Sequence, residues 1–418
     1  MTELSGAGLV VPRKLRALEQ MGPLKLFVVL ALVSLVPSAS RYEYELSSFA
    51  AGLAGVCAGL IVATVFGLLP RPSKGFLKHL IACALITGLA AGHIILTYAQ
   101  GQPELERPFQ SLALMAAMLL SSYVARQAFF REGLALDYSI YALFALFIVL
   151  AIAGYLGFAP YSRIASDRPI YPFTEPSHFA LAIMPFFVYS VTVANPLWRL
   201  SMLAVATAIV LALQSLSLGV GVIIAAVCCL RSTWLTLFLL VAGLILASLD
   251  LSYFTDRLDF SYGNDNLSTL VFRQGVEISM IALAETKGWG IGFQRLGFTD
   301  LYSVSSNLLY ALTGDDLNLR DGGFTAAKLI VELGAIGAIL LLGYLYYLMY
   351  AILKLRRAAL IDATADRGTL FALSCFVGAF VELFVRGAGY FTPTMLLLIA
   401  AVPIALQNRE KRKSDVAK

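Results

Sequence analysis

The segment Arg168-Pro-Ile-Tyr-Pro-Phe-Thr-Glu175-Pro-Ser-His178-Phe-Ala180 joins a polar connection to the start of an apolar run. Pro176 suits the first position of a helix, where its missing N–H would have no partner in any case, so Thr174 or Glu175 is the expected N-cap. Glu175 and His178 are three residues apart and would share one face of that helix. Ionisable groups at the edge of an apolar run are costly and mark a candidate site. The alternative is that Glu175 only caps the helix and that His178 lies at a lipid or water boundary.

The composition around this segment is that of a polytopic membrane protein. The 418-residue chain is 59% hydrophobic and 14% charged, whereas soluble domains carry about 25% charged residues. Its mean hydropathy is +0.80. Basic residues precede the first apolar run, and no small-residue cleavage site follows it, so we expect this run to be retained. The net charge of +5 is modest and indicates topology, not a nucleic-acid partner.

Apolar runs of about 17 to 25 residues are long enough to cross a membrane as helices, and the chain contains twelve candidates. The least regular block is 197–249, because its serines and glycines between 215 and 221 fit either three short helices or one helix broken in the membrane. The twelve ranges are 22–38, 46–70, 76–98, 109–130, 135–158, 177–195, 197–213, 216–230, 233–249, 324–353, 367–386 and 389–406. The expected fold is therefore an all-α polytopic membrane protein, with residues 1–418 forming a single integral membrane domain.

The distribution of positive charge predicts the orientation of these spans. With the N-terminus in the cytoplasm, most of the 31 lysines and arginines fall on the inner side, and the asymmetry is clearest in the short loops. An even number of spans places both termini in the cytoplasm. Residues 250–323, between the ninth and tenth spans, then form a long outer loop. Within it, residues 267–285 show helical periodicity, with Arg273 and Glu277 four apart, which predicts an interfacial helix.

Ionisable residues gather on this predicted outer side. Glu175 and His178 open the sixth span, and Arg386 ends the eleventh, with Glu382 one turn below it. His93 lies near the outer end of the third span, where a hydrogen bond between helices is the commoner role. The other charged candidates are Arg163, Arg168, Arg257, Arg273, Arg295, Asp315, Asp316, Arg320 and Asp321.

An excess of arginine on the outer side opposes the positive-inside rule, so we expect an anionic partner there. Planar guanidinium groups suit phosphate or pyrophosphate. The simpler interpretations are solvated loop charges for Arg163 and Arg257, a surface pair of Arg273 with Glu277, and an intramembrane pair of Arg386 with Glu382. An enzyme that faces outward has no access to ATP, so the free energy for its reaction must come from the substrate. A lipid-linked sugar pyrophosphate is such a substrate.

The five cysteines also limit the possible chemistry. They all fall inside apolar stretches and are Cys57, Cys83, Cys228, Cys229 and Cys375. No Cys/His pair has the spacing of metal ligands, and the adjacent acids Asp315 and Asp316 have no further ligands nearby in the sequence. The sequence therefore predicts no disulfide framework, no metal site and no cofactor.

These motifs resemble those of the bacterial O-antigen polymerases and the related O-antigen ligases. The polymerases often carry a Phe-x-Glu-Pro-Ser-like segment before a membrane helix, matched by Phe173-Thr-Glu175-Pro-Ser177. The shared domain has an Arg-containing helix that leads to a Gly-x-Gly turn, matched by Arg273 and Gly288-Trp-Gly290-Ile-Gly292. An acidic residue and a small-residue run follow, matched by Glu332-Leu-Gly334-Ala-Ile-Gly337. The segment Ser215-Leu-Ser-Leu-Gly-Val-Gly221 is similar to the family's Ser-Arg-Gly segment but lacks its Arg.

The resemblance implies a metal-independent glycosyltransferase in the bacterial inner membrane, with its active face in the periplasm. It would polymerise oligosaccharide repeat units linked to undecaprenyl pyrophosphate, as for O-antigen, and would release undecaprenyl pyrophosphate. Membrane lipid and a chain-length regulator protein are further expected partners. Glu175 is the first candidate base and His178 the second. The candidate ligands of the pyrophosphate and glycan are Arg168, Arg273, Arg295, Arg320 and Arg386.

Two other functions fit part of the pattern. A ligase of this family, which transfers the finished chain to lipid A-core, uses a histidine near the end of the long outer loop, and this loop has none. A flippase or other transporter of lipid-linked oligosaccharide can also have twelve helices, but it should line a mid-membrane cavity with polar groups. Here the polar groups gather at the outer edge, which favours the polymerase.

Overall fold

The computed structural model describes residues 22–416, apart from 71–74, 100–104, 131–133, 167, 249–251, 262, 315–318, 320–321 and 362–364. The predicted ligand Arg320 and the acidic residues Asp315, Asp316 and Asp321 lie outside the described residues. Those that are described form helices and their connections, with one isolated bridge between Ile170 and Phe173 and no strand. The all-helical prediction is confirmed for this part of the chain.

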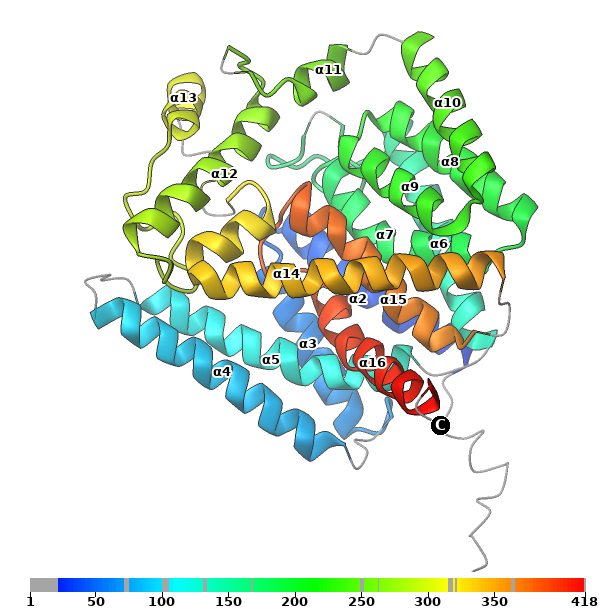
Figure 1. Ribbon diagram of the computed structural model, residues 1–418, viewed down its shortest axis with the longest axis horizontal. Coiled ribbons are helices and arrows are strands. Elements are labelled where there is room, and N and C mark those ends of the chain that lie inside the picture. The colour runs from blue at the N-terminus through cyan, green and yellow to red at the C-terminus, as the bar shows by residue number, and fades with distance from the viewer. Residues whose placement is uncertain are drawn as a thin grey trace, which may run out of the picture.

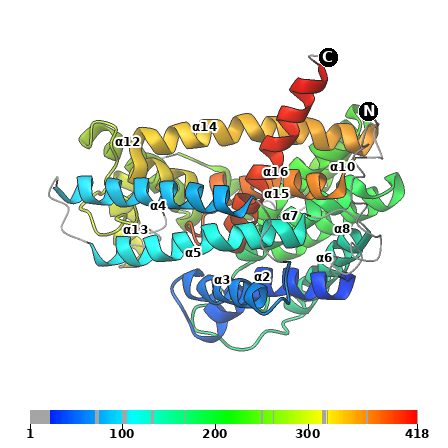
Figure 2. The same ribbon diagram turned by 90° about the horizontal axis from the view of Figure 1, so that it is seen from below.

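The first five helices form two hairpins and one further helix. In Figure 2, α2 and α3 lie in one layer, α4 and α5 in the next, and α14 at the opposite edge. Gly52 allows the close approach of α3 to α2, because a Cβ there would lie 2.6 Å from the Cα of Pro37. The helices are α2 (Pro23–Glu43), α3 (Ala50–Val65), α4 (Phe76–Ala99), α5 (Glu106–Phe129) and α6 (Leu134–Tyr155).

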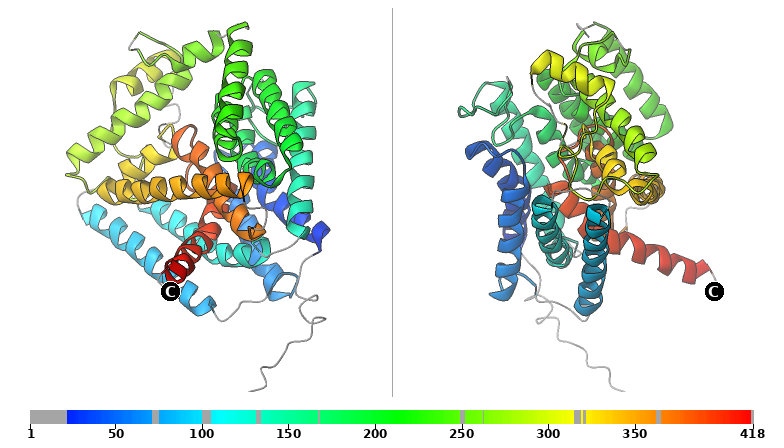
Figure 3. Two further views of the ribbon diagram at one scale, coloured as in Figure 1. Left: turned by 45° about the vertical axis from the view of Figure 1, so that its right-hand side comes forward. Right: turned by 90° about the vertical axis from the view of Figure 1, so that its left-hand side faces the viewer.

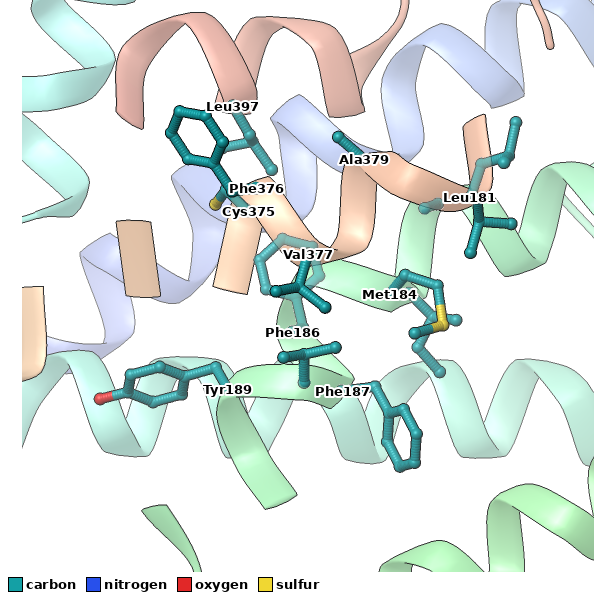
Figure 4. Packing of buried hydrophobic residues seen from close by; sticks show 14 of the residues in the cluster. Leu181, Met184, Phe186, Phe187, Tyr189, Cys375, Phe376, Val377, Ala379 and Leu397 are labelled. Atoms are coloured by element: carbon teal, nitrogen blue, oxygen red, sulfur yellow. The ribbon is translucent and has the colours of Figure 1, made fainter. Parts of the chain in front are cut away.

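Two helices from distant parts of the chain, α7 (Pro176–Val193) and α15 (Arg367–Phe384), form the centre of the core. Both are apolar around nearly their whole circumference, which is the pattern of a helix surrounded by others. In Figure 4, side chains of α7 such as Phe186 pack against side chains of α15 such as Val377. The backbones come close where a Cβ on Gly378 would lie 2.7 Å from the N of Pro185. This packing aligns the start of α7 with the end of α15.

The irregular block 197–249 forms three helices, so the alternative of one broken helix is wrong. The helices are α8 (Pro196–Leu213), α9 (Leu216–Cys229) and α10 (Ser232–Ser248). The turn between α8 and α9 uses a left-handed backbone at Gln214 (φ 48°). Ser215 then caps α9, because its hydroxyl accepts a hydrogen bond from the N–H of Leu218.

The predicted outer loop contains three helices, which precede the longest helix of the chain. They are α11 (Ser252–Leu258), α12 (Leu267–Glu285) and α13 (Val304–Thr313), followed by α14 (Thr325–Leu360). The helix expected over residues 267–285 is confirmed with these bounds, and Asn266 caps it. Figure 1 shows α14 across the middle of the molecule, with α11 at the edge between α12 and α10. The last helix, α16 (Pro393–Val416), projects from the bundle at its C-terminal end (Figure 3).

Nine of the described helices are long and apolar enough to cross a membrane: α2, α4, α5, α6, α7, α8, α12, α14 and α15. Eight of them coincide with predicted spans. The other four predicted spans correspond to α3, α9, α10 and α16, whose apolar parts are shorter. The ninth helix, α12, is the one predicted as interfacial. These apolar helices support a multi-pass membrane protein.

Candidate active site

A cavity of about 580 Å³ lies where several helix ends meet. Its walls come from the start of α7, the turn between α8 and α9, the helices α11 and α12, and the end of α15. In Figure 1 these elements surround the upper centre of the molecule. The charged residues in its lining are Arg168, Glu175, Arg257 and Arg386. Among the described residues, the lining therefore carries three positive charges and one negative charge, which favours an anionic occupant.

Glu175 occupies the N-cap position of α7, with Pro176 as the first helical residue, as the sequence predicts. Its backbone is extended (φ −153°, ψ 157°), and its side chain makes no capping hydrogen bond to the helix. The carboxylate instead reaches two other side chains. Its Oε1 lies 3.0 Å from Nη2 of Arg386 and 2.9 Å from Nε2 of His178. Capping alone therefore does not account for Glu175.

The three groups differ in their access to the cavity. The side chains of Glu175 and Arg386 are 26% and 24% exposed, whereas that of His178 is 5% exposed. Both partners of the ion pair line the cavity, and the histidine lies behind them. An anion that enters the cavity can therefore reach Arg386 and Glu175 without rearrangement of the core.

The His178 ring is held on several sides. Its Nδ1 lies 2.8 Å from the hydroxyl of Thr174, and its Nε2 lies 3.2 Å from Nη1 of Arg41. The Phe49 ring meets the imidazole edge-on at 4.9 Å and also lies under the Arg41 guanidinium. A ring whose Nε2–H donates to Glu175 and whose Nδ1 accepts from Thr174 satisfies both nitrogens. These contacts fix the ring in place against Glu175.

The surroundings of Glu175 keep it ionised. Burial alone would raise the pKa of this carboxyl group, but the charge interactions with His178 and the Arg386 guanidinium, together with the hydrogen bond from His178, outweigh it. Together they hold the pKa of Glu175 well below its ordinary value. The group therefore carries a lone pair at neutral pH, as a base requires, but it is a weak base while Arg386 is its partner.

Close backbone packing places Arg386 at the cavity. The residue after it, Gly387, donates its N–H to the carbonyl of Gly323 at 3.3 Å, and a Cβ on Gly387 would lie 2.4 Å from the N of Thr325. The end of α15 thus lies directly against the start of α14. The pairing of Arg386 with Glu382 that the sequence permits is not formed: Arg386 pairs with Glu175, and Glu382 is fully buried beside hydroxyls of α16.

The structure brings together only part of the predicted set of arginines. Arg168 is exposed and lines the cavity with Arg386. Arg273 does not line it: one guanidinium nitrogen donates to the carbonyl of Ser261 at 2.9 Å, and another lies 3.7 Å from Glu277. Arg295 is 1% exposed and donates towards the carbonyl of Ile94 in α4 at 3.4 Å.

Sequence reasoning left two arginines of this region out of the set of candidate ligands. Arg257 was interpreted as a solvated loop charge, but it lines the cavity. Arg41 lies at the end of α2 and contacts His178, and the sequence assigned it no role. Both fall on the predicted outer side, so the same signal that selected the other arginines, positive charge where the topology disfavours it, was available for them.

Two of the motifs that carry the family resemblance pack against each other, outside the cavity lining. Gly334 interrupts α14 with a non-helical backbone (φ 58°, ψ −133°). Around it, Ala335 donates to the carbonyl of Gly288 at 2.7 Å, and Gly292 donates to the carbonyl of Glu332 at 3.0 Å. The buried Glu332 carboxylate also accepts the N–H of Gln294 at 2.8 Å. The motifs therefore form a junction between the 288–297 turn and α14.

His93 belongs to this junction. Its Nε2 lies 3.0 Å from the carbonyl oxygen of Trp289, so it ties α4 to the glycine-rich turn. The simpler interpretation, a hydrogen-bonding histidine between elements, is the one the geometry supports.

The remaining reactive groups are buried. All five cysteines are buried and free. Within the described part of the chain, no group of three or more His, Cys, Asp and Glu side chains is placed to hold a metal ion.

Comparisons with known proteins add no identification. No protein-family model, no curated protein and no solved structure matches the chain. The resemblance to the O-antigen polymerases and ligases consequently rests on the sequence motifs, and its functional content is a proposal.

Proposed function

We propose that this protein is a membrane glycosyltransferase that polymerises oligosaccharides linked to undecaprenyl pyrophosphate, at the periplasmic face of the bacterial inner membrane. The observation that carries the proposal is the cavity of about 580 Å³, whose described lining includes three arginines and a glutamate that pairs with one of them and with a buried histidine. The set offers donors for a pyrophosphate and a proton acceptor for a hydroxyl group.

The proposed topology has twelve spans with both termini in the cytoplasm. Alternating crossings then place the start of α7, the turn between α8 and α9, the start of α14 and the end of α15 on the same outer side. These are the segments that line the cavity, together with α11 and α12 of the long loop. The cavity is thus assembled from elements that charge asymmetry alone assigns to one side.

The lining suits both parts of a lipid-linked donor. Arg168, Arg257 and Arg386 supply guanidinium donors for the two phosphates. Apolar side chains of the same walls, among them Phe272 and Phe384, offer contacts for the first isoprene units. A soluble sugar phosphate would leave this apolar surface uncovered, so we favour a polyprenyl-linked substrate.

In the proposed reaction, a hydroxyl oxygen at the non-reducing end of one lipid-linked unit attacks the anomeric carbon of the growing chain. The bond between that carbon and the pyrophosphate oxygen breaks, and its electron pair leaves with undecaprenyl pyrophosphate. The hydroxyl proton passes to the Glu175 carboxylate, which the Nε2–H of His178 holds in position. The arginines stabilise the charge that develops on the leaving pyrophosphate.

The test is the ladder of lipopolysaccharide from a cell that lacks this chain, compared with cells complemented by the wild type and by Glu175→Gln. Core that carries a single repeat unit is the expected product of both the deletion and the variant. Bare core with polymer on the lipid carrier would identify a ligase instead. Bare core with repeat units trapped on the cytoplasmic side would identify a flippase.

A further inference from the structure

The Glu175–Arg386 ion pair lies where the proposed substrate needs to bind. Both side chains line the cavity, and the pair joins one guanidinium nitrogen to one carboxylate oxygen at 3.0 Å. We propose that Glu175 is an internal competitor for the anion site: the pyrophosphate of the lipid-linked substrate displaces the carboxylate from Arg386, and this exchange releases Glu175 to act as the base. The inference rests on the proposed function and adds how the site is regulated.

The geometry of the shared oxygen supports the exchange. Oε1 of Glu175 meets both Arg386 at 3.0 Å and His178 at 2.9 Å. When Arg386 turns to a phosphate, the carboxylate keeps its contact to His178, which Thr174 and Phe49 hold in place. Glu175 therefore keeps its position after Arg386 has turned to the phosphate.

The charges in the cavity favour the incoming group. One carboxylate brings a single negative charge, whereas a pyrophosphate diester brings two, and Arg168 and Arg257 line the same cavity. A phosphate can also engage the guanidinium fork at two points, whereas the contact to Glu175 uses one nitrogen and one oxygen. Both features make pyrophosphate the stronger partner of Arg386.

The exchange also couples binding to chemistry. A carboxylate that loses a neighbouring cation becomes a stronger base. After the exchange, the groups next to Glu175 are His178 and Ser177, with Arg41 behind the histidine. Proton uptake by Glu175 is thereby favoured only when a pyrophosphate is in place, so the base is active only in the donor-bound site.

The experiment measures binding of inorganic pyrophosphate to the full-length protein in detergent by titration calorimetry. Glu175→Gln should tighten binding about fivefold, because removal of the competing ion pair is worth about 1 kcal/mol. Arg386→Gln should weaken binding by a similar factor. The matched control is Glu277→Gln, since Glu277 is also paired to an arginine but does not line the cavity, and it should leave affinity unchanged.

Two further variants separate competition from simple loss of negative charge. Glu175→Asp keeps the charge but shortens the side chain, so it should also tighten binding. In the Arg386→Gln background, Glu175→Gln should change affinity less than twofold, because the competition no longer exists. Each protein is first checked for a cooperative thermal transition within a few degrees of that of the wild type.

The outcomes are decisive in either direction. The inference is overturned if Glu175→Gln binds pyrophosphate no tighter than the wild type, if the tightening persists without Arg386, or if no variant binds pyrophosphate. Tighter binding in a Glu175→Gln protein that still supports a normal lipopolysaccharide ladder would keep the competition and reject the catalytic role of Glu175. Failure of the inference and failure of the proposed function are thus distinguishable.

Discussion

Two arginines at opposite ends of α7 use their charge in different ways. Arg386 meets Glu175 at the start of α7, beside the large cavity, and is about one quarter exposed. Arg199 lies at the other end, is 6% exposed, and donates only to backbone carbonyls. Its acceptors are Val191 and Thr192 of α7, the C-cap Ala194, Cys229 of α9 and Ala359 of α14, at 2.9 to 3.3 Å.

The difference teaches what makes an arginine available for a ligand. The last carbonyls of a helix lack partners within it and carry a partial negative charge. Arg199 satisfies carbonyls of three such ends, so its donors are occupied even though a cavity of about 330 Å³ lies beside it. Arg386 has one carboxylate contact that an anion can replace. Positive charge near a helix end therefore has a structural role in one case and, in our proposal, a catalytic role in the other.

The largest effect is expected from Arg199→Ala. It removes the donors of five buried carbonyls, which should lower the free energy of unfolding by about 3–5 kcal/mol and reduce the yield of folded protein. Thermal unfolding in detergent measures the change. The control is Arg231→Gln, because Arg231 is exposed beside the same cavity and should cost less than about 0.5 kcal/mol. Equal stability of Arg199→Ala and Arg231→Gln would contradict the structural role.

A large effect on activity with little effect on stability is expected from Glu175→Gln. Loss of the base should reduce polymer formation by a factor of about 10²–10⁴. Chain length on a lipopolysaccharide gel measures this, with membrane expression as the check on folding. Normal chain lengths would show that Glu175 is not the base. The site around Arg386 would then have no catalytic role to contrast with the structural role of Arg199.

A smaller effect is expected from Arg386→Lys. Lysine keeps the charge but lacks the planar fork, so we expect about a tenfold loss in the rate of polymerisation. Shorter chains on the same gel would show this. The matched variant is Arg273→Lys, on a guanidinium that does not line the cavity, and it should leave chain length unchanged. An equal loss in Arg386→Lys and Arg273→Lys would show that an arginine in the cavity matters no more for polymerisation than one outside it.

The smallest effect concerns the acid stability of the site. The pKa of Glu175 is held below its ordinary value, so its ionised form stabilises the fold above the unfolded pKa of about 4.3. This contribution is lost as the pH falls through the lower, folded pKa. The melting temperature of the wild type should therefore exceed that of Glu175→Gln by about 1–3 °C at pH 7. The gap should begin to narrow as the pH falls below about 4.3 and should close once the pH is below the folded pKa. A gap that does not narrow over this acid range would show that the ionised form of Glu175 does not stabilise the protein.

Local patterns in the sequence predicted much of the fold. The apolar runs located helices α2 to α10 and α14 to α16, and periodicity located α12, because both signals depend on neighbours along the chain. The lengths were less accurate. The run 46–70 contains only α3, since residues 66–69 turn away from the helix, and α14 continues seven residues beyond the predicted 353. Apolar residues occur in membrane spans, in core helices and in the connections that follow them, so an apolar run does not by itself show where a helix ends.

The contacts of the candidate site also divide into local contacts, which the sequence predicts, and long-range contacts, which it does not. The contact of Glu175 with His178 follows from their spacing of three residues, and the structure confirms it. The contact of Glu175 with Arg386 joins residues 211 positions apart, and no local pattern contains it. Arg295 shows the converse, because the sequence places it on the outer side with the others while the structure buries it against α4.

By itself, the sequence determined the helical class, the membrane character, the positions of most helices and the local unit of Glu175, Pro176 and His178. Each follows from composition or from spacing along one helix. Only the tertiary structure decided which arginines meet that unit and which are used elsewhere. The reason is physical: α7 and α15 are apolar on nearly every face, so their sequences do not specify a partner. Close packing at Pro185 and Gly378 sets how the helix ends meet.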